Sequence, residues 1–299
     1  MLLDLPLART ELDRAAHLRT DQGALDEMWQ RAKIIDLLGD RFKSLNGALS
    51  FVDQSAGGER YFLGLDSSGT PYFVAHRSTD TSEFPDEYQS LRTLGAQLSP
   101  LEIGAAVHAL AVSQWHDAHR RCSKCGGENR SVQGGAVREC ALCSAQHHPR
   151  TDPAVIVLVK DTNDRILLGH QKVWPPKRYS TFAGFVEPGE SFESAVIREV
   201  AEECKGNVVT MNYLGSQPWP FPASIMIAYV ATIDNPEEVK PDGEEIESLL
   251  WLDRAEIKKL SESRELLLPP SISVARAMIN SWYGPSAKIE LSGGETWRS

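Results

Sequence analysis

Short runs of alternating apolar and polar residues make up much of the first hundred positions of the chain. Two of these runs, residues 60–66 and 71–75, are separated by the turn-forming segment from Ser67 to Thr70. Alternating runs joined by a short polar turn are typical of a β-hairpin. From Pro100 to His119, apolar residues instead recur at the helical period, which predicts a helix that begins after Ser99. We therefore expect a small α+β domain in this part of the chain.

The second half of the chain contains a continuous apolar run and a second helical pattern. Residues 154–159 are all apolar, which indicates a strand that is buried on both faces. Beyond the Pro-Gly turn at residues 188–189, apolar residues fall four positions apart and Ser191 fits the N-cap. This pattern predicts a helix from Phe192 to Cys204. Strands and helices are interspersed as far as Trp282.

The length of the chain and the distribution of its apolar residues predict the division into domains. A chain of 299 residues is too long for one typical core and suits two domains with a small inserted module. Residues 120–150 are rich in Cys, Gly, Arg and His and too poor in apolar residues to form a core. We expect an N-terminal domain over residues 1–119, the inserted module over 120–150, a second domain over 151–283 and a loose C-terminal tail over 284–299.

Composition and charge narrow the classes of function. Hydrophobic residues make up 41% of the chain and charged residues of both signs 24%, values typical of a folded globular protein. A net charge of -10 at pH 7 disfavours binding to long nucleic acids, because Lys and Arg supply most of that affinity. A small anionic ligand held through metal ions is compatible with this charge. The first residues lack the layout of a secretory signal and no apolar run is long enough to span a bilayer, so we expect a cytoplasmic protein with no membrane partner.

Four of the five cysteines form two Cys-x-x-Cys pairs, Cys122 with Cys125 and Cys140 with Cys143. Two such turns can place four thiolates at the corners of a tetrahedron, which is the geometry of a zinc site. A catalytic zinc needs an open coordination position, whereas four thiolates close the shell, so we expect one structural Zn²⁺ ion per chain. For the two histidines just beyond the second pair, a polar approach to the next strand is favoured over a place in a substrate pocket.

Three glutamates share one face of the predicted helix over residues 192–204. Glu199, Glu202 and Glu203 are related by spacings of three and four positions, so their carboxylates lie within about one turn of each other. Like charges this close repel one another unless cations bind between them, and oxygen-rich clusters select hard ions such as Mg²⁺ or Mn²⁺. For these three residues alone, a solvated acidic surface is the other interpretation.

The residues around this face favour the metal site. Gly184, Glu190 and the segment from Arg198 to Glu203 resemble the Nudix box, the signature of hydrolases that cleave nucleoside diphosphates linked to another moiety. In the family that carries this box, the arginine orients the site through the preceding glutamate, which implies that role for Arg198 and Glu190. The metal ligands that the resemblance implies are Glu199, Glu202, Glu203 and a backbone carbonyl near Ala183.

The sequence departs from the Nudix box at the end of the predicted helix. The family pattern has a glycine where this chain has Lys205, one position before Gly206. A glycine there caps the helix in a left-handed conformation, which a lysine adopts only at a cost in free energy. We therefore expect the cap to move to Gly206, with no effect on the metal ligands.

A proline-rich segment extends from Ser216 to Ser224, with proline at positions 218, 220 and 222. Proline removes backbone donors, so this segment cannot be a central strand and is expected to form a stiff loop. The loop holds Trp219 and Phe221, and a rigid aromatic ring is a suitable platform for a stacked nicotinamide or adenine ring. The alternative, in which both rings belong to the core, is disfavoured by the polar residues that flank them.

Together, the Nudix box, the four-cysteine module and the proline-rich loop resemble the NADH pyrophosphatases, the NudC type of Nudix hydrolase. The resemblance is strongest from Cys122 to Trp282. It implies an α+β fold in which a Nudix α/β/α sandwich is preceded by a zinc ribbon and a small N-terminal α+β domain. The substrate contacts that it implies are Phe185, Gln217, Pro218, Trp219, Pro220, Phe221, Pro222, Ala223, Ser224 and Ala275. Arg92 and His148 are further substrate candidates, and Glu245 is a further metal ligand.

The reaction that this resemblance implies is hydrolysis of the diphosphate bridge of NAD(H) to nicotinamide mononucleotide and AMP. It would use more than one Mg²⁺ or Mn²⁺ ion per site to activate water and to neutralise phosphoryl charge. The catalytic set would be Glu199, Glu202, Glu203, Arg198 and Glu190. The same reaction would remove an NAD cap from the 5′ end of RNA, and the family is homodimeric.

Two other functions stay open at this point. One is a Nudix hydrolase for ADP-ribose or a dinucleoside polyphosphate, which the proline-rich loop disfavours. The other is a non-catalytic nucleotide sensor or a nucleic-acid-binding ribbon protein. The intact glutamates disfavour the sensor, and the net charge disfavours the nucleic-acid binder.

Overall fold

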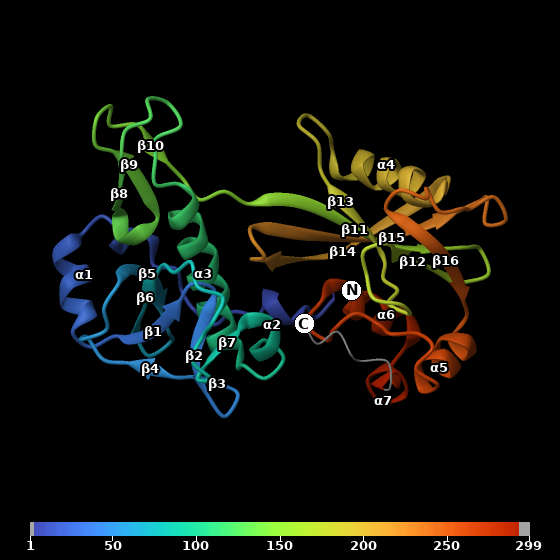
Figure 1. Cartoon of the computed structure of the whole chain (residues 1–299), viewed down its shortest axis with the longest axis horizontal. Helices are drawn as coiled ribbons and strands as arrows, with labels where there is room; N and C mark the ends of the chain where they lie inside the picture. Colours follow the sequence, from blue (N-terminus) through green and yellow to red (C-terminus); the bar gives the residue numbers. More distant parts are fainter. Residues whose placement is uncertain (1–2, 293–299) are drawn as a thin grey trace. The chain divides into compact units, whose positions relative to one another are not determined.

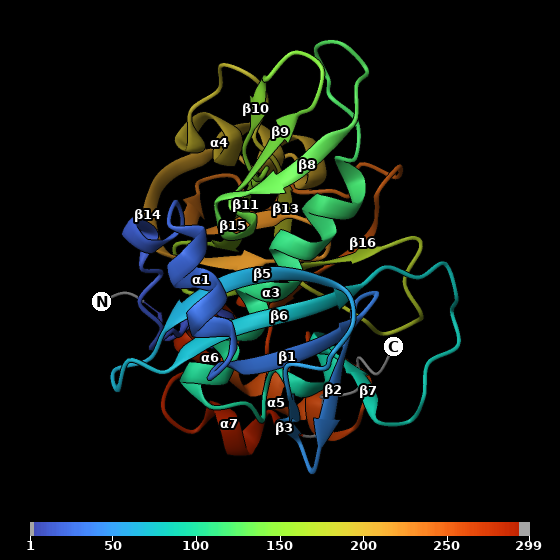
Figure 2. The ribbon, with the colours of Figure 1, turned by 90° about the vertical axis from the view of Figure 1, so that its left-hand side faces the viewer.

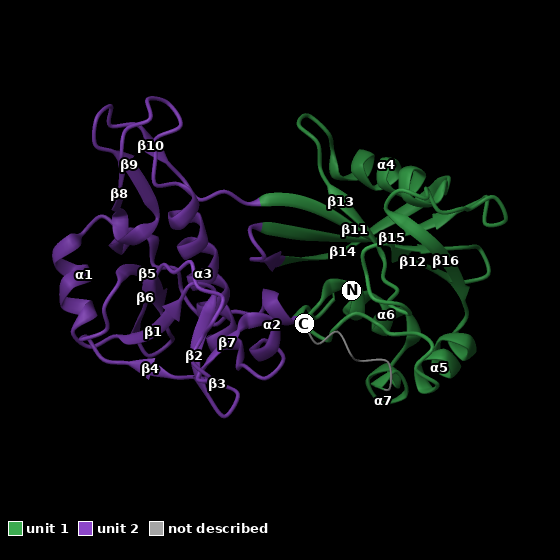
Figure 3. Cartoon of the chain, viewed as in Figure 1, with its two compact units in different colours: residues 1–5, 152–217, 224–299 green, residues 6–151, 218–223 purple. Residues whose placement is uncertain are grey.

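The computed structural model describes residues 3–292, and the chain folds into two compact units. Unit 1 comprises residues 1–5, 152–217 and 224–299, and unit 2 comprises residues 6–151 and 218–223 (Figure 3). The chain therefore passes from one unit to the other four times. The predicted N-terminal domain falls mainly and the inserted module wholly in unit 2, and residues 284–292 of the predicted tail fall in unit 1.

Unit 2 contains a seven-stranded sheet. Its strands are β1 (Lys33–Leu38), β2 (Arg41–Leu45), β3 (Ala48–Leu49), β4 (Phe51–Val52), β5 (Glu59–Leu65), β6 (Pro71–Arg77) and β7 (Tyr88–Ser90). The strand order is β3-β2-β1-β6-β5, with β4 paired to β1 and β7 paired to β2. Because β5 and β6 are antiparallel partners, the predicted hairpin is confirmed.

Helices cover both faces of this sheet. Successive residues of a strand point to opposite faces, so Ile34 packs in a core cluster with Trp29 of helix α1 (Gln22–Trp29). Its neighbour Ile35 packs in a second cluster with Leu110 of helix α3 (Pro100–Ala118). Figures 1 and 2 show the sheet lying between α1 and α3.

Helix α3 begins where the sequence predicts. The side chain of Ser99 accepts a hydrogen bond from the N–H of Glu102, and the Glu102 carboxylate accepts one from the N–H of Ser99. A capping box of this kind satisfies two backbone donors that have no partner within the helix. The helix ends at Ala118, one residue before the predicted end. A one-turn helix, α2 (Leu91–Leu94), precedes it.

The cysteine-rich module forms a three-stranded sheet of its own, in the order β10-β9-β8. Its strands are β8 (Asn129–Val132), β9 (Val137–Cys140) and β10 (Gln146–His147). These strands are only two to four residues long and bury few apolar side chains. The module therefore depends on something other than an apolar core, as its composition predicts.

Unit 1 is built on a six-stranded mixed sheet. Its strands are β11 (Asp152–Lys160), β12 (Ile166–Gln171), β13 (Phe182–Phe185), β14 (Val208–Trp219), β15 (Ser224–Ile233) and β16 (Ile246–Leu252). The order is β14-β15-β11-β12-β16, and β13 pairs with β11 beside β12. The central strand β11 runs parallel to β15 and antiparallel to β12 and β13.

Helices lie on both faces of this sheet as well (Figure 1). They are α4 (Phe192–Cys204), α5 (Arg254–Glu262), α6 (Val274–Tyr283) and α7 (Ala287–Glu290). Val155 and Val157 of β11 share a core cluster with α4, whereas Ile156 and Leu158 share another with α5, α6 and α7. The apolar run is thus a strand buried on both faces, and the predicted α+β fold is confirmed. No helix within residues 3–292 is long and apolar enough to cross a membrane.

The proline-rich segment differs from its prediction. Strand β14 continues as far as Trp219, so residues 216–219 lie in a strand and only residues 220–223 form a turn. β14 is an edge strand of the sheet. An edge strand tolerates proline because one row of its backbone groups makes no ladder hydrogen bonds. The expectation of a loop throughout this segment is therefore wrong.

The C-terminal segment as far as residue 292 packs on unit 1, so the prediction of a loose tail is wrong there. The side chains of Ala287 and Leu291 are buried in the core cluster that contains α6. The guanidinium of Arg276 donates a hydrogen bond of 2.9 Å to the carbonyl of Leu291. Two apolar positions in so short a segment give no recognisable helical period. Residues 293–299 of the predicted tail lie outside the described residues.

The packing of the segment around α7 predicts the effect of truncating Leu291, the buried residue that follows the helix. Leu291→Ala is expected to lower the free energy of unfolding by about 2 to 4 kcal/mol, because it leaves a cavity in the core of unit 1. Ile289→Ala is the control, since Ile289 lies two residues away and is 80% exposed. Urea unfolding followed by circular dichroism measures both variants. Equal effects of the two substitutions would contradict the docking of this segment.

Candidate functional site

Helix α4 carries the predicted glutamates and has the bounds that the sequence predicts. Ser191 is its N-cap, and the serine oxygen accepts a hydrogen bond of 3.1 Å from the N–H of Ser194. Glu202 is exposed, whereas Glu199 and Glu203 are buried, with 8% and 4% of their surface exposed. A solvated acidic surface is therefore the wrong interpretation for two of the three glutamates.

Lys205 itself takes the left-handed conformation at the end of α4, with φ 60° and ψ 23°. Its N–H donates to the carbonyl of Ala201 at 3.1 Å, and the N–H of Gly206 donates to the carbonyl of Val200 at 3.2 Å. The expectation that the cap moves to Gly206 is thus wrong. The Lys205 ammonium donates to the carbonyl of Glu202 at 3.1 Å, which satisfies a helix-terminal acceptor and offsets part of the backbone cost.

Arg198 connects the carboxylates of the Nudix box. Its Nε and Nη2 atoms donate to the two oxygens of Glu190 at 2.9 and 2.8 Å. Nη1 donates to Glu199 at 2.7 Å and to Glu202 at 3.0 Å, and Nη2 also donates to the carbonyl of Phe185 at 2.9 Å. The hydrogen bonds from Arg198 lower the pKa of Glu190 to about 2. This geometry is the one that the predicted orienting role of Arg198 requires.

Gly184 lies in β13 at a point where no side chain fits. A Cβ atom at this position would come within 1.9 Å of a carboxylate oxygen of Glu199. Gly184 pairs with Val155 of the central strand β11, so the Glu199 carboxylate packs directly against the backbone of the sheet. The glycine is required here by this close approach.

A cavity of about 370 Å³ lies beside α4. Its lining residues are Glu199, Glu202, Glu203, Lys205, Asp242, Glu244 and Glu245. The structure therefore places Glu245 with the three helix glutamates, as its predicted role needs. Asp242 and Glu244 are not among the predicted residues, although the acidic stretch that they form with Glu245 is a sequence signal that could identify them. Oδ1 of Asp242 accepts hydrogen bonds from three successive backbone N–H groups, which holds this loop in place.

Glu203 occupies the most crowded part of this cavity. Burial, and then the carboxylates of Glu245, Glu199 and Asp242, raise the pKa of Glu203 to about 9. Its Oε2 atom is buried and has no hydrogen-bond partner. Burial also raises the pKa of Glu199. A divalent cation would relieve the repulsion and provide a partner for Oε2, so this all-oxygen set of donors fits Mg²⁺ or Mn²⁺.

The carboxylate oxygens surround the cavity without gathering at one point. Within residues 3–292, the only set of three or more Cys, His, Asp or Glu ligand atoms within 4.8 Å of one another consists of the four paired cysteines. Arg198 instead bridges Glu199 and Glu202. The predicted backbone ligand, Ala183, lies in β13 beside Glu203, where a backbone hydrogen bond from Ala183 reaches the Glu203 carboxylate.

The paired cysteines gather at one end of the three-stranded module. The Sγ atoms of Cys122, Cys125, Cys140 and Cys143 all lie within 4.8 Å of one another, and none of them forms a disulfide. Backbone N–H groups two residues after Cys122 and Cys140 donate to these sulfurs at 3.4 Å. A backbone hydrogen bond from Cys143 lowers the pKa of Cys140 to about 6, which favours the thiolate that binds metal. Four sulfur donors fit a structural zinc ion.

His147 contacts one of these cysteines. Its Nε2 atom lies 3.3 Å from Sγ of Cys122, so a proton on Nε2 donates to the sulfur. Groups that hydrogen-bond a metal ligand orient it and tune its affinity for the metal. His147 is thus placed to support the zinc site, whereas its neighbour His148, the predicted substrate contact, is exposed.

Trp219 and Phe221 lie in the proline-rich segment, in the part that belongs to unit 2. Both side chains are half-buried and pack against the core cluster on the α3 side of the sheet. The Arg92 guanidinium lies 5.1 Å from the ring centre of Trp219 and 4.0 Å from that of Phe221. The structure therefore brings three predicted substrate residues together. The core interpretation of the two rings is right in part, because the core of unit 2 partly covers both.

Other predicted substrate residues have different surroundings. Phe185 is 61% exposed at the end of β13. Gln217 and Ala275 are buried in unit 1, where Nε2 of Gln217 donates to the carbonyl of Ile272 at 3.0 Å. Neither of these two lines the cavity beside α4. Their substrate contacts, like that of Phe185, stay predictions.

Known proteins resemble this chain along most of its length. A model of the NUDIX domain family matches residues 150–269. A protein of Mycobacterium bovis named NAD-capped RNA hydrolase NudC is 36% identical over 92% of this chain and 94% of its own length. The human NAD-capped RNA hydrolase NUDT12 is 35% identical over 62% of this chain and 43% of its own length. A crystal structure of a NUDIX hydrolase from Nitrosomonas europaea matches 46% of this chain and 79% of the hydrolase chain. The two are 22% identical in sequence, and the TM-score is 0.39.

The cysteine geometry predicts a zinc content that depends on Cys122. Cys122→Ser is expected to lower bound zinc from about one ion per chain to near none, since structural zinc uses four closed ligands. His147→Gln should keep the zinc but weaken its binding by about tenfold, because a hydrogen bond to a ligand is lost. Metal analysis and competition with a chelator measure the two effects. Cys204→Ala is the control, because Cys204 lies in α4, and a loss of zinc from this variant would contradict the assignment.

The surroundings of Glu203 predict how stability depends on pH without added Mg²⁺ or Mn²⁺. A carboxyl group whose pKa is raised on folding from about 4.5 to about 9 stabilises the fold below pH 4.5, and this contribution is lost as pH rises to 9. Glu203→Gln is therefore expected to raise the free energy of unfolding at pH 8 by at least about 1 kcal/mol. Glu202→Gln, at an exposed position, should have little effect. Urea unfolding at pH 5 and pH 8 makes the comparison, and a gain of the same size at both pH values would contradict the explanation.

Proposed function

Because the chain belongs to the NudC family of Nudix hydrolases, we propose that it hydrolyses the diphosphate bridge of NAD(H) to nicotinamide mononucleotide and AMP. The observation that carries the proposal is the cavity beside α4, where Glu245 joins the buried carboxylates of Glu199 and Glu203. The names of the relatives extend the proposal to the removal of an NAD cap from the 5′ end of RNA.

The carboxylates of this cavity are the groups that would hold the catalytic ions. Glu199, Glu202, Glu203 and Glu245 offer only oxygen donors, which suit more than one Mg²⁺ or Mn²⁺ ion. Bound divalent ions would neutralise charge on the diphosphate and make water a better nucleophile. The four cysteines would hold one Zn²⁺ ion with a structural role.

Arg198 is the residue that positions this set. Glu190 and the carbonyl of Phe185 hold its guanidinium, which leaves Nη1 directed at Glu199 and Glu202. Because Arg198 already holds the carboxylates of Glu199 and Glu202 in position, less entropy is lost when the ions and the substrate bind. One carboxylate of the cluster would accept the proton of the attacking water.

The substrate would use the residues around the end of β14. A half-buried indole such as that of Trp219 offers a flat surface for a nucleobase or a nicotinamide ring. Arg92 lies over the same ring and adds a positive charge suited to a phosphate. We propose Phe185 as a second ring beside the nicotinamide. A homodimer and a cytoplasmic location complete the proposal, and both rest on the sequence and the family.

The test of the proposal is incubation with NADH and either Mg²⁺ or Mn²⁺, with the products separated by chromatography. We expect reduced nicotinamide mononucleotide and AMP in equal amounts, because hydrolysis leaves the nicotinamide ring of NADH reduced. Glu202→Gln and Glu203→Gln are expected to lower kcat/KM by at least about 100-fold, because a missing metal ligand removes charge stabilisation in the transition state. RNA with an NAD cap, tested in the same way, should lose nicotinamide mononucleotide and leave a 5′-monophosphate.

Glu193→Gln is the matched control for these variants. Glu193 lies in the first turn of the same helix, and its carboxylate accepts a hydrogen bond from the hydroxyl of Tyr229 rather than lining the cavity. Its activity should stay within about twofold of the parent chain. If ADP-ribose is cleaved far faster than NADH, the chain is a Nudix hydrolase of different specificity. If no substrate is cleaved with either metal, the enzymatic proposal is wrong.

A further inference from the structure

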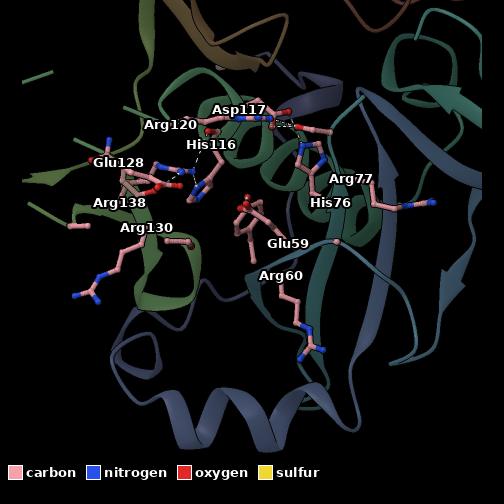
Figure 4. Close-up of a pocket in the computed structure, with 16 residues that line it drawn as sticks. Glu59, Arg60, His76, Arg77, His116, Asp117, Arg120, Glu128, Arg130 and Arg138 are labelled. Atoms are coloured by element: carbon pink, nitrogen blue, oxygen red, sulfur yellow. Dashed lines mark hydrogen bonds and ion pairs between the residues drawn. The ribbon is translucent and has the colours of Figure 1, made fainter. Parts of the chain in front are cut away.

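A second cavity, of about 880 Å³, is lined entirely by residues of unit 2. Its walls come from β5, β6, the end of α3 and the three-stranded module. In Figure 4 the side chains that gather toward its middle are Glu59, His76, His116, Asp117 and Arg138. The same view shows Arg60, Arg77 and Arg130 pointing outward. The cavity is therefore polar and carries charges of both signs.

The middle of this cavity holds a buried guanidinium. Arg138 of β9 is 6% exposed. Its Nη1 atom donates to Nδ1 of His116 at 2.6 Å and to the His116 carbonyl at 3.2 Å, and Nη2 donates to the carbonyl of Asn129 at 2.9 Å. The Nε atom is buried and has no hydrogen-bond partner. Two of the acceptors of Arg138 are carbonyl oxygens, and the third is a ring nitrogen.

His116 is neutral in this arrangement and cannot balance the charge of Arg138. Its Nε2 atom lies 2.8 Å from the carbonyl of Gly135, to which it donates, so Nδ1 is left as the acceptor for Arg138. The ring is stacked on Tyr61 with the ring centres 4.1 Å apart. Burial lowers the pKa of His116 to about 4, in agreement with this tautomer. The pair therefore keeps the full positive charge of the guanidinium.

Of the three carboxylates that line the cavity, Glu128 is exposed and the other two are paired with other groups. Asp117 is joined to His76 and to Arg120, and the hydroxyl of Tyr61 donates to Glu59. Within residues 3–292, no carboxylate forms an ion pair with Arg138 at 4.0 Å or less. A buried charge without a nearby opposite charge destabilises the fold unless a ligand supplies one.

Two more buried atoms at the cavity have no hydrogen-bond partner. They are Nδ1 of His76 and Oδ1 of Asn129, in side chains that are 3% and 4% exposed. Nδ2 of Asn129 donates to the carbonyl of His119 at 3.1 Å, which assigns Oδ1 as an acceptor. A ligand that offers an acceptor to Arg138 and a donor, such as a hydroxyl group, to Asn129 would suit these two side chains.

We infer that this cavity binds a nucleoside phosphate, with its phosphate beside Arg138 and Arg120 and a ribose hydroxyl beside Asn129. Guanidinium groups are well matched to phosphate oxygens. The cavity is large enough for a ligand of this size, whereas a bare anion would fill little of it. The site would accept a free mononucleotide or one nucleotide of an RNA chain. It is independent of the hydrolysis proposed above, because none of its lining residues lines the cavity beside α4 or is one of the proposed substrate contacts.

The experiment is calorimetric titration of the full, zinc-loaded chain with AMP, in the absence of Mg²⁺ and Mn²⁺. Arg138→Lys keeps the charge but removes Nε and the planar fork, and it is expected to weaken AMP binding by about tenfold. Arg120→Gln tests the rim of the site with an exposed side chain and little risk to folding, and it is expected to weaken binding by about threefold. A short uncapped oligoribonucleotide, titrated in competition with AMP, distinguishes the two sources of the ligand.

Two control variants locate the binding. Arg31→Gln removes an exposed arginine of unit 2 that lies outside the cavity, and Glu202→Gln alters the cavity beside α4. Both are expected to bind AMP like the parent chain. Displacement of AMP by the oligoribonucleotide would identify an RNA chain as a ligand, and AMP binding without displacement would identify the free nucleotide. No binding of either ligand, or unchanged AMP binding in both Arg138→Lys and Arg120→Gln, would overturn the inference.

Discussion

Repulsion between buried carboxylates is the constraint on which unit 1 depends. Glu203 is enclosed beside Glu199 and Glu245, and only an added positive charge can make this arrangement favourable when all three are ionised. Neighbouring residues accommodate these carboxylates. Gly184 leaves room for a carboxylate against the sheet, and Arg198 supplies a guanidinium that contacts Glu199 and Glu202. The fold is therefore arranged for metal binding at some expense of its own stability.

Unit 2 also contains a buried charge that the neighbouring side chains do not balance, and this charge is positive. Arg138 is buried among neutral acceptors, and the carboxylates of Asp117 and Glu59 at its cavity are engaged by other side chains. Buried charges in folded proteins are as a rule paired, so an imbalance of this kind indicates a ligand. The two units thus resemble each other in their electrostatics although they share no sheet topology. The charges of the first cavity suit a cation, and those of the second suit an anion.

Features that depend on local sequence could be predicted, and those that depend on distant contacts could not. The bounds of α4 follow from its period and from Ser191, and the four cysteines are identified by spacing alone. The left-handed Lys205 depends on a contact of its own side chain that spacing does not show. The packing of Leu291 depends on Arg276 and on a core that forms elsewhere in the chain. Asp242 reaches the cavity only because β16 pairs with β12 and places the preceding loop beside α4.

The four passages of the chain between the units have a consequence for the order of folding during synthesis. The N–H of Leu3 donates to the carbonyl of Leu214 at 2.8 Å, and Leu5 lies in the core of unit 1. These residues are synthesised before their partners, since Leu214 lies 211 positions after Leu3 and Ile156 lies 151 positions after Leu5. Most of unit 2 emerges in between and can fold early, because domains generally fold as units during translation. Until the segment from Asp152 onward is synthesised, Leu3 and Leu5 have no partner elsewhere in unit 1.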